Sequence, residues 1–226
     1  MSIRKQPLIT GEIYHIYNRG VDKRDIFLDK NDIYRFIESV KEFNREDKII
    51  SLANLRKSKL LKIVALPLSK KKLVEIIGYC FNPNHFHFIL KQVSDNGISK
   101  FMHKLQGGYS YYFNIKNARS GSLFQGKFKS QIIVSENYFN KTLGYVNKNY
   151  QVHDIPEDKK DLVFASDYEY EHNDFKIVSK TEGKRMLEIF GGVNGFKKHC
   201  DEIVEIIRKE RGKTSLLEDE DLPDRA

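Results

Sequence analysis

Two histidines lie one residue apart in the run NPNHFHFIL, which spans residues 82–90. The run is apolar after an Asn-Pro-Asn turn signal, so we expect a buried strand there. Residues two apart in a strand share a face, so His85 and His87 point to one face of the sheet while Phe86 and Phe88 point to the other. Two imidazoles at this spacing suit one metal cation, although a pair of ordinary strand histidines has the same pattern. A metal site therefore needs a third ligand nearby.

A helix predicted after Ser135 supplies a candidate third ligand. The sequence ENYFNKTLGYVNKNY follows this capping serine and has apolar residues at helical spacing. Tyr145 and Asn149 are four residues apart, so they lie one above the other on a flank of the helix. An amide oxygen beside a phenol would place a metal ligand next to a nucleophile. The helical wheel does not separate Tyr145 from Tyr138, and most of the 12 tyrosines must be structural or on the surface.

Positive charge is concentrated in one part of the chain. The formal net charge is +8, although the last residues, SLLEDEDLPDRA, hold five acids and one arginine. Between Gly97 and Asn149 there are eight lysines and arginines, one acid and ten phenylalanines and tyrosines. Such a segment suits a channel that follows a sugar-phosphate backbone and stacks unpaired bases. We expect a polyanionic partner, with nucleic acid ahead of an anionic membrane; the alternative is a charge that only keeps the protein in solution.

The cysteines and the start of the chain bear on its location. Cys80 and Cys200 are far apart and lack C-x-x-C spacing, so we expect neither a disulfide framework nor a zinc-thiolate site. The opening MSIRKQPLIT lacks the apolar region of a signal peptide, and no apolar run approaches the length of a membrane span. We therefore expect a soluble cytoplasmic protein without a membrane partner.

Strands and helices alternate around these residues. The spacing of apolar residues predicts, in order, a strand at 13–17, a helix capped by Asp29 or Asn31, strands at 73–81 and 85–93, a helix at 97–117, a strand at 128–135 and a helix at 136–150. This order predicts an α+β fold, a ferredoxin-like sandwich with an antiparallel sheet and the helices on one face.

Four blocks of the sequence resemble a known family. In order they are YHIYNRG, GYCFNPNHFHFIL, SGSLFQGKFKS and LGYVNKN, and they run from about Tyr14 to Asn149. Together they resemble the single-tyrosine transposases of the HUH superfamily, and within it the REP-associated tyrosine transposases. Their order and spacing are much more specific than any one block. The resemblance implies a ferredoxin-like domain that cleaves and rejoins single-stranded DNA through a 5′-phosphotyrosine.

The resemblance also implies the roles of individual residues. The metal-binding histidines fall on His85 and His87, the nucleophile on Tyr145, and the polar third ligand on Asn149; the implied ion is Mg²⁺ or Mn²⁺. The family usually has Asn-Pro after the nucleophile, whereas this chain has Asn149-Tyr150. We therefore expect the helix to continue where it stops in relatives.

The implied partner is single-stranded DNA that carries a hairpin, of the REP type or from an element end. We predict DNA contacts from one group of polar and cationic side chains: Arg19, Gln125, Lys127, Lys129 and Lys148. The protein would act at the nucleoid as a monomer or a homodimer. Two alternatives stay open: a relaxase-like nickase, and an inactive, domesticated regulator that binds DNA hairpins.

The chain is expected to divide into three parts. Residues 1–155 would form the catalytic domain, with an insertion at about 47–72. Residues 156–212 would form a helical appendage, and residues 213–226 a disordered acidic tail.

Overall fold

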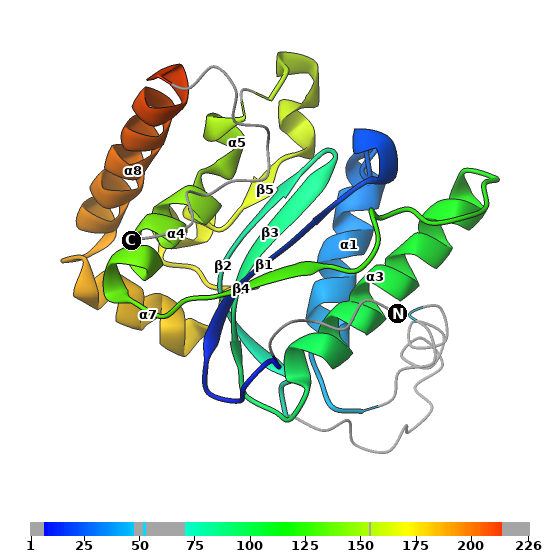
Figure 1. Cartoon of the computed structure of the whole chain (residues 1–226), viewed down its shortest axis with the longest axis horizontal. Coiled ribbons are helices and arrows are strands. Elements are labelled where there is room, and N and C mark those ends of the chain that lie inside the picture. The colour runs from blue at the N-terminus through cyan, green and yellow to red at the C-terminus, as the bar shows by residue number, and fades with distance from the viewer. Residues whose placement is uncertain (1–6, 48–51, 53–70, 154, 214–226) are drawn as a thin grey trace.

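The computed structural model describes residues 7–47, 52, 71–153 and 155–213. Within this part of the chain one antiparallel sheet has the strand order β4-β1-β3-β2-β5 (Figure 1). Its strands are β1 (Ile13–Arg19), β2 (Val74–Asn82), β3 (His85–Gln92), β4 (Lys129–Ile132) and β5 (Phe164–Ala165). The first four strands of that order give the arrangement of a ferredoxin-like sheet, and the α+β prediction is confirmed.

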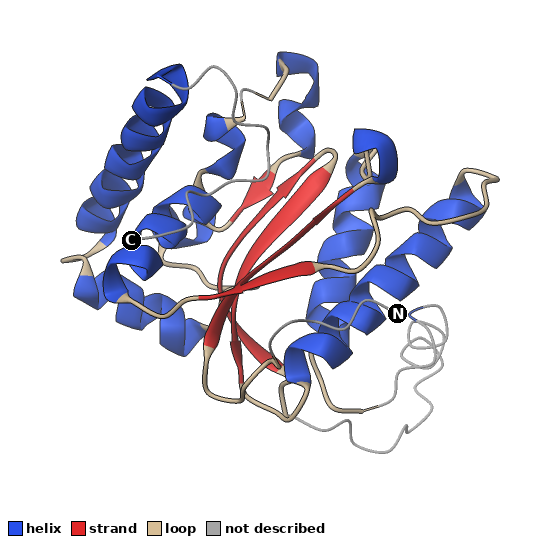
Figure 2. Cartoon of the chain, viewed as in Figure 1, coloured by secondary structure: helices blue, strands red, loops and turns tan. Residues whose placement is uncertain are grey.

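Helices cover both faces of this sheet (Figure 2). The helices are η1 (Val21–Lys23), α1 (Lys30–Phe43), α3 (Gly97–Lys116), α4 (Glu136–Asn147), α5 (Asn149–Val152), η2 (Glu157–Leu162), α6 (Asp167–His172), α7 (Lys180–Ile189) and α8 (Val193–Lys213). The prediction of helices on one face describes α1 and α3. Helix α4 lies on the opposite face, with α8 packed against its outer side (Figure 1).

The alternation of side chains along β3 separates these two faces. Phe86 packs against Phe36 of α1, and Phe88 packs against Phe101 of α3, with ring centroids 5.6 and 6.0 Å apart. The rings on this face are fully buried, and they form the apolar core under α1 and α3. The histidines of β3 consequently point toward α4, as the two-residue period predicts.

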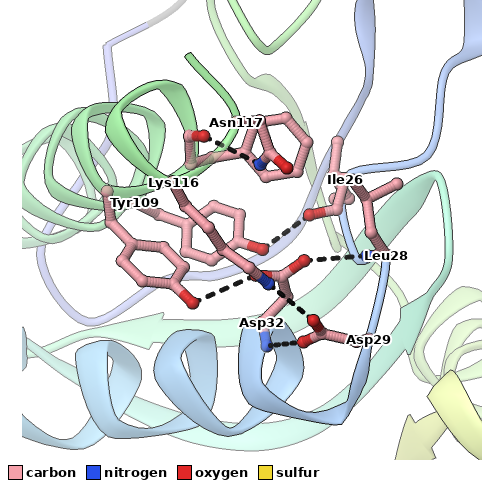
Figure 3. A network of polar contacts seen from close by, with 9 residues as sticks. Ile26, Leu28, Asp29, Asp32, Tyr109, Lys116 and Asn117 are labelled. Carbon is pink, nitrogen blue, oxygen red and sulfur yellow. Dashed lines mark hydrogen bonds and ion pairs between the residues drawn. The ribbon is translucent and has the colours of Figure 1, made fainter. Parts of the chain in front are cut away.

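A polar network joins the first turn of α1 to the last turn of α3 (Figure 3). Asp29 caps α1, because its Oδ1 accepts from the amide of Asp32 at 3.0 Å. The ammonium of Lys116 lies 2.7 Å from Asp29 Oδ2 and 2.6 Å from Asp32 Oδ1. The buried carboxylate of Asp32 also accepts from the Tyr112 hydroxyl at 3.1 Å and from the Leu28 amide at 2.9 Å. Of the two caps considered for this helix, the structure selects Asp29.

The helix that follows Ser135 is interrupted. Ser135 caps α4 as predicted, because its hydroxyl accepts from the amide of Tyr138. The prediction that the helix continues unbroken to residue 150 is wrong: α4 ends at Asn147, Lys148 has non-helical angles (φ −120°, ψ 28°), and Asn149 begins the short helix α5. The side chain of Asn149 accepts a hydrogen bond from Asn82 at the end of β2.

The C-terminal part joins the same sheet and core. Strand β5 pairs with β2, and α8 packs along α4. The division at residue 155 stays a prediction. Most of the predicted insertion at 47–72, and the predicted tail after residue 213, lie outside the described residues. Among the helices that the structure describes, none is both long enough and apolar enough to cross a membrane.

Candidate active site

The two histidines of β3 each hold one ring nitrogen in place and direct the other toward α4. His85 Nδ1 lies 2.6 Å from Asn84 Oδ1, and His87 Nδ1 lies 2.9 Å from His15 Nε2 on the neighbouring strand β1. A second partner of this kind fixes the tautomer and orientation of a metal-binding imidazole. The Nε2 atom of each ring is directed to the site, where His85 Nε2 also lies 2.8 Å from Asn82 Nδ2.

Burial keeps two of these rings neutral. It lowers the pKa of His15 to about 3, and it lowers the pKa of His87 well below the usual value, with a smaller contribution from neighbouring histidines. A neutral imidazole is the form that binds metal. His87 can present a lone pair on Nε2 only if its Nδ1 carries the proton and donates to His15 Nε2.

Tyr145 lies against these histidines from α4. Its ring meets the His87 ring edge-on, with centroids 5.5 Å apart and an interplanar angle of 82°, and meets the His15 ring at 6.1 Å and 90°. The residue is 5% exposed, and its hydroxyl lies 3.4 Å from His153 Nε2. The helical wheel left Tyr138 and Tyr145 as equivalent choices, and the structure brings Tyr145 to the histidines.

Asn149 reaches the site from the first position of α5. Its Oδ1 accepts from Asn82 Nδ2 at 2.6 Å and lies 3.0 Å from His85 Nε2. The residue is fully buried, and its Nδ2 has no hydrogen-bond partner among the described residues. The amide oxygen of Asn149 is therefore next to the ring nitrogen that His85 presents, as the predicted ligand set requires.

His153 is a site residue that the sequence reasoning missed. One ring nitrogen from each of His85, His87 and His153 lies within 4.8 Å of the other two. His153 follows α5, eight residues after Tyr145, where the predicted helix register no longer applies. Its residue type and its spacing of four residues from Asn149 were the available signals. His15 was also missed, and the alternation of the run YHIYNR, which places its side chain on a strand face, could have indicated it.

These residues fit a divalent metal ion. Imidazole nitrogens and an amide oxygen are suitable ligands for a first-row divalent ion. Adjacent ligands of an octahedral site with bonds of about 2.1 Å lie about 3 Å apart, and His85 Nε2 and Asn149 Oδ1 are 3.0 Å apart. The ligand atoms of the three histidines are also close enough to bind one ion.

A pocket opens beside the histidines and is lined largely by polar side chains. Its lining includes His85, His87 and His153, together with Tyr17, Arg19, Lys23, Gln125, Lys129 and Lys159. Of the predicted DNA contacts, Arg19, Gln125 and Lys129 line this pocket. The Arg19 Nε donates a hydrogen bond to Gln125 Oε1. The Lys129 ammonium lies over the Tyr17 ring, 5.9 Å from its centroid. Lys127 is exposed nearby in sequence.

Lys148 has a different environment. Its side chain is 6% exposed, and its ammonium lies 2.8 Å from Asp201 Oδ1 on α8 and 4.0 Å from Glu171 Oε1 on α6. The predicted contact of Lys148 with DNA stays a prediction.

Comparison with known proteins adds a family and a fold. Residues 44–149 match the family model described as "Transposase IS200 like". A solved structure described as the REP-associated tyrosine transposase bound to a REP hairpin is similar, with a TM-score of 0.51 and 16% identity, over 79% of this chain and 91% of that one. No curated protein matches the chain. The structural likeness shows a shared fold, and the family match includes His85, His87, Tyr145 and Asn149. The predicted resemblance to the single-tyrosine transposases is confirmed by the match of residues 44–149 to the IS200-like transposase model.

Proposed function

We propose that this chain is a transposase that cleaves and rejoins single-stranded DNA beside hairpins, with Tyr145 as the nucleophile. One observation carries the proposal: the Tyr145 hydroxyl, three histidine nitrogens and the Asn149 oxygen converge beside a pocket with cationic walls. The match to a transposase family supports the reaction class. The similar fold of a transposase bound to a REP hairpin supports a hairpin as the partner.

The proposed cleavage is an in-line displacement at phosphorus. The Tyr145 oxygen would attack the scissile phosphate, and the bond from phosphorus to the 3′ oxygen would break, which leaves a 5′-phosphotyrosine and a free 3′-hydroxyl. The phenol proton is lost during attack, because a tyrosine with an ordinary pKa of about 10 is a weak nucleophile at neutral pH. The phosphotyrosine is again a diester, so a second 3′-hydroxyl can reverse the step and join new strands.

We propose His85, His87 and Asn149 as ligands of a divalent ion, with His153 as a further nitrogen ligand. Such an ion, Mg²⁺ or Mn²⁺, would neutralise the charge that develops on the scissile phosphate. Magnesium prefers oxygen ligands, whereas imidazole ligands suit manganese at least as well. The chain's own contribution is to orient these side chains through Asn84, Asn82 and His15.

The basic wall of the pocket would hold the DNA strand. We propose that Arg19, Lys127 and Lys129 contact phosphates and that Gln125 makes a polar contact. The place of Arg19, Gln125 and Lys129 in the pocket wall supports this, as does the exposure of Lys127. Contacts to phosphate set orientation and affinity, and they depend strongly on salt. We therefore expect affinity for the hairpin to survive the loss of the metal ligands.

The test is a labelled single-stranded hairpin substrate incubated with Mg²⁺ or Mn²⁺. The wild type should form a covalent protein-DNA adduct that migrates slowly in a denaturing gel, and Tyr145→Phe should form none. Tyr138→Phe is the matched control, because it removes a hydroxyl from the same helix, and it should form the adduct at the wild-type rate. His85→Ala should bind the hairpin without forming the adduct.

Two results would contradict the proposal. An unchanged adduct in Tyr145→Phe would remove Tyr145 from the reaction. Hairpin binding by the wild type with no adduct in either metal would favour the inactive, DNA-binding regulator.

A further inference from the structure

Lys148 lies in the sequence between the proposed nucleophile and the proposed third ligand. We infer that Lys148 is a positioning residue, whose ion pair with Asp201 of α8 fixes the break between α4 and α5 and so sets Tyr145 and Asn149 relative to each other. This inference rests on the proposed function of those two residues.

The break changes how the two side chains are directed at the site. In a continuous helix, residues 145 and 149 would lie one above the other and point the same way. Here Lys148 has non-helical angles, and Asn149 starts a new helix. Tyr145 meets the rings of His15 and His87, while Asn149 turns to Asn82 and His85. The direction of the chain at Lys148 therefore decides how far apart the two functional groups lie.

The side chain of Lys148 is held away from the pocket by acids. Its ammonium is 2.8 Å from Asp201 Oδ1. The Glu171 carboxylate pairs with two lysines, at 4.0 Å from the Lys148 ammonium and 3.3 Å from the Lys197 ammonium. Burial opposes the charged form, but the hydrogen bond and charge of Asp201 outweigh it and raise the pKa of Lys148. A DNA phosphate placed at this ammonium would have to approach the carboxylates of Asp201 and Glu171. The pair is thus suited to hold the backbone rather than to bind DNA.

Helix α8 holds the chain on both sides of the break. Before it, His199 donates to the carbonyl of Asn140 at 2.9 Å. After it, Arg208 donates to the carbonyl of Gln151 at 2.6 Å. Lys148 lies between these two contacts, so its pair with Asp201 anchors the junction itself.

Lys148→Met removes this ion pair without leaving a buried charge, whereas Asp201→Asn leaves the buried ammonium of Lys148 with Glu171 at 4.0 Å. The side chain of Asp201 is 46% exposed, so water can solvate it when Lys148→Met removes the ammonium. Methionine keeps the apolar stem of the side chain. Asp201→Asn removes the opposite charge on α8, outside the proposed catalytic and DNA-binding groups.

The experiment compares Lys148→Met, Asp201→Asn and the double variant in single-turnover adduct formation and in hairpin binding over a range of salt. The matched control is Lys141→Met, because Lys141 on α4 also pairs with α8, through Glu210 at 3.2 Å, but lies away from the break. We expect both single variants to form the adduct about ten- to a hundredfold more slowly, as small misplacements of reacting groups do. The double variant should be no slower than the slower single variant, because the two residues act as one pair.

Affinity for the hairpin and its salt dependence should be unchanged in these variants. If Lys148 contacted a DNA phosphate, its loss would lower both the affinity and the salt dependence. A salt slope lowered by about one in Lys148→Met, with a normal rate in Asp201→Asn, would overturn the inference and assign Lys148 to DNA. Normal rates in both variants would overturn it as well. If circular dichroism shows that Lys148→Met does not fold, the rate of adduct formation by Asp201→Asn alone tests the inference. The wild type and Tyr145→Phe run in parallel: absence of a Tyr145-dependent adduct in the wild type would refute the proposed function instead.

Discussion

Gly144 lies on α4 directly beside Tyr145, where α8 approaches most closely. A Cβ atom at this position would meet the Cβ, Cγ1 and Cγ2 atoms of Ile203 at 2.7, 2.8 and 3.0 Å. These atoms are near the backbone of α8 and belong to a branched side chain, so they cannot move aside cheaply. Gly144→Ala must therefore push α8 away from α4.

The expected magnitude follows from two opposing effects. Alanine in a helix is favoured over glycine by about 1 kcal/mol. Overpacking by one carbon in a tight interface costs about 1–3 kcal/mol. Gly107 provides the reference, because it lies exposed within α3 and a Cβ there would have no atom within 4 Å. Gly107→Ala should gain stability, and the two variants should differ by the overpacking cost, about 1–3 kcal/mol.

Urea unfolding of both variants measures this difference directly. Adduct formation measures its consequence, because Tyr145 is the next residue: we expect Gly144→Ala to react more slowly than the wild type and Gly107→Ala to match the wild type. Equal stability of the two variants would refute the close approach of α4 and α8. A loss of stability without any change in rate would refute the coupling of that contact to the site.

Three further predictions concern other contacts. Lys116→Met removes the ammonium partner of the buried Asp32 carboxylate (Figure 3). The carboxylate still accepts from the Tyr112 hydroxyl and the Leu28 amide, so unfolding in urea should show a loss of about 1–3 kcal/mol. The Lys116 hydrogen bond also lowers the pKa of Asp29 in the folded protein. Its contribution is present at neutral pH and is lost as the pH falls from the usual value of about 4 through this lowered pKa. Stability should therefore fall less on acidification in Lys116→Met than in the wild type, and an equal fall would contradict this. His15→Phe removes the partner that orients His87, and calorimetry should show about ten- to a hundredfold weaker Mn²⁺ binding; unchanged binding would show that His87 needs no such partner.

Local patterns in the sequence were sufficient for much of the fold. The two-residue period of β3 predicted that His85 and His87 face the tyrosine helix while Phe86 and Phe88 pack on the other side of the sheet. The contacts of His87 with Tyr145, of His85 with Asn149, and of the two phenylalanines with α1 and α3 agree with this. The order of strands and helices predicted the ferredoxin-like fold, because few topologies accommodate that order. Caps were found from single residues, since Ser135 and Asp29 act within one turn.

Features that depend on contacts between distant segments could not be predicted in this way. His15 reaches His87 across the register of β1 and β3, which the sequence of neither strand contains. His153 lies beyond the predicted end of the helix at residue 150 and directly follows α5, so its place in the cluster depends on how the chain folds after α4. From the sequence, Lys148 was counted as one of the cations of a basic segment. Its ion-pair partner, Asp201, lies 53 residues later on α8, so the pair could not be predicted from the neighbouring sequence.

The end of α4 shows why the C-terminal part matters to the site. Asn147 is fully buried and its Oδ1 accepts from the Ser166 hydroxyl at 2.7 Å. The same hydroxyl oxygen accepts from the amide of Tyr79 on β2 at 2.8 Å. Ser166 immediately follows β5, so the residue that holds the last turn of α4 to the sheet comes from beyond the predicted domain boundary at residue 155. Because α8 holds the outer side of α4 and Ser166 its end, the segment that follows residue 155 completes the support of the tyrosine helix.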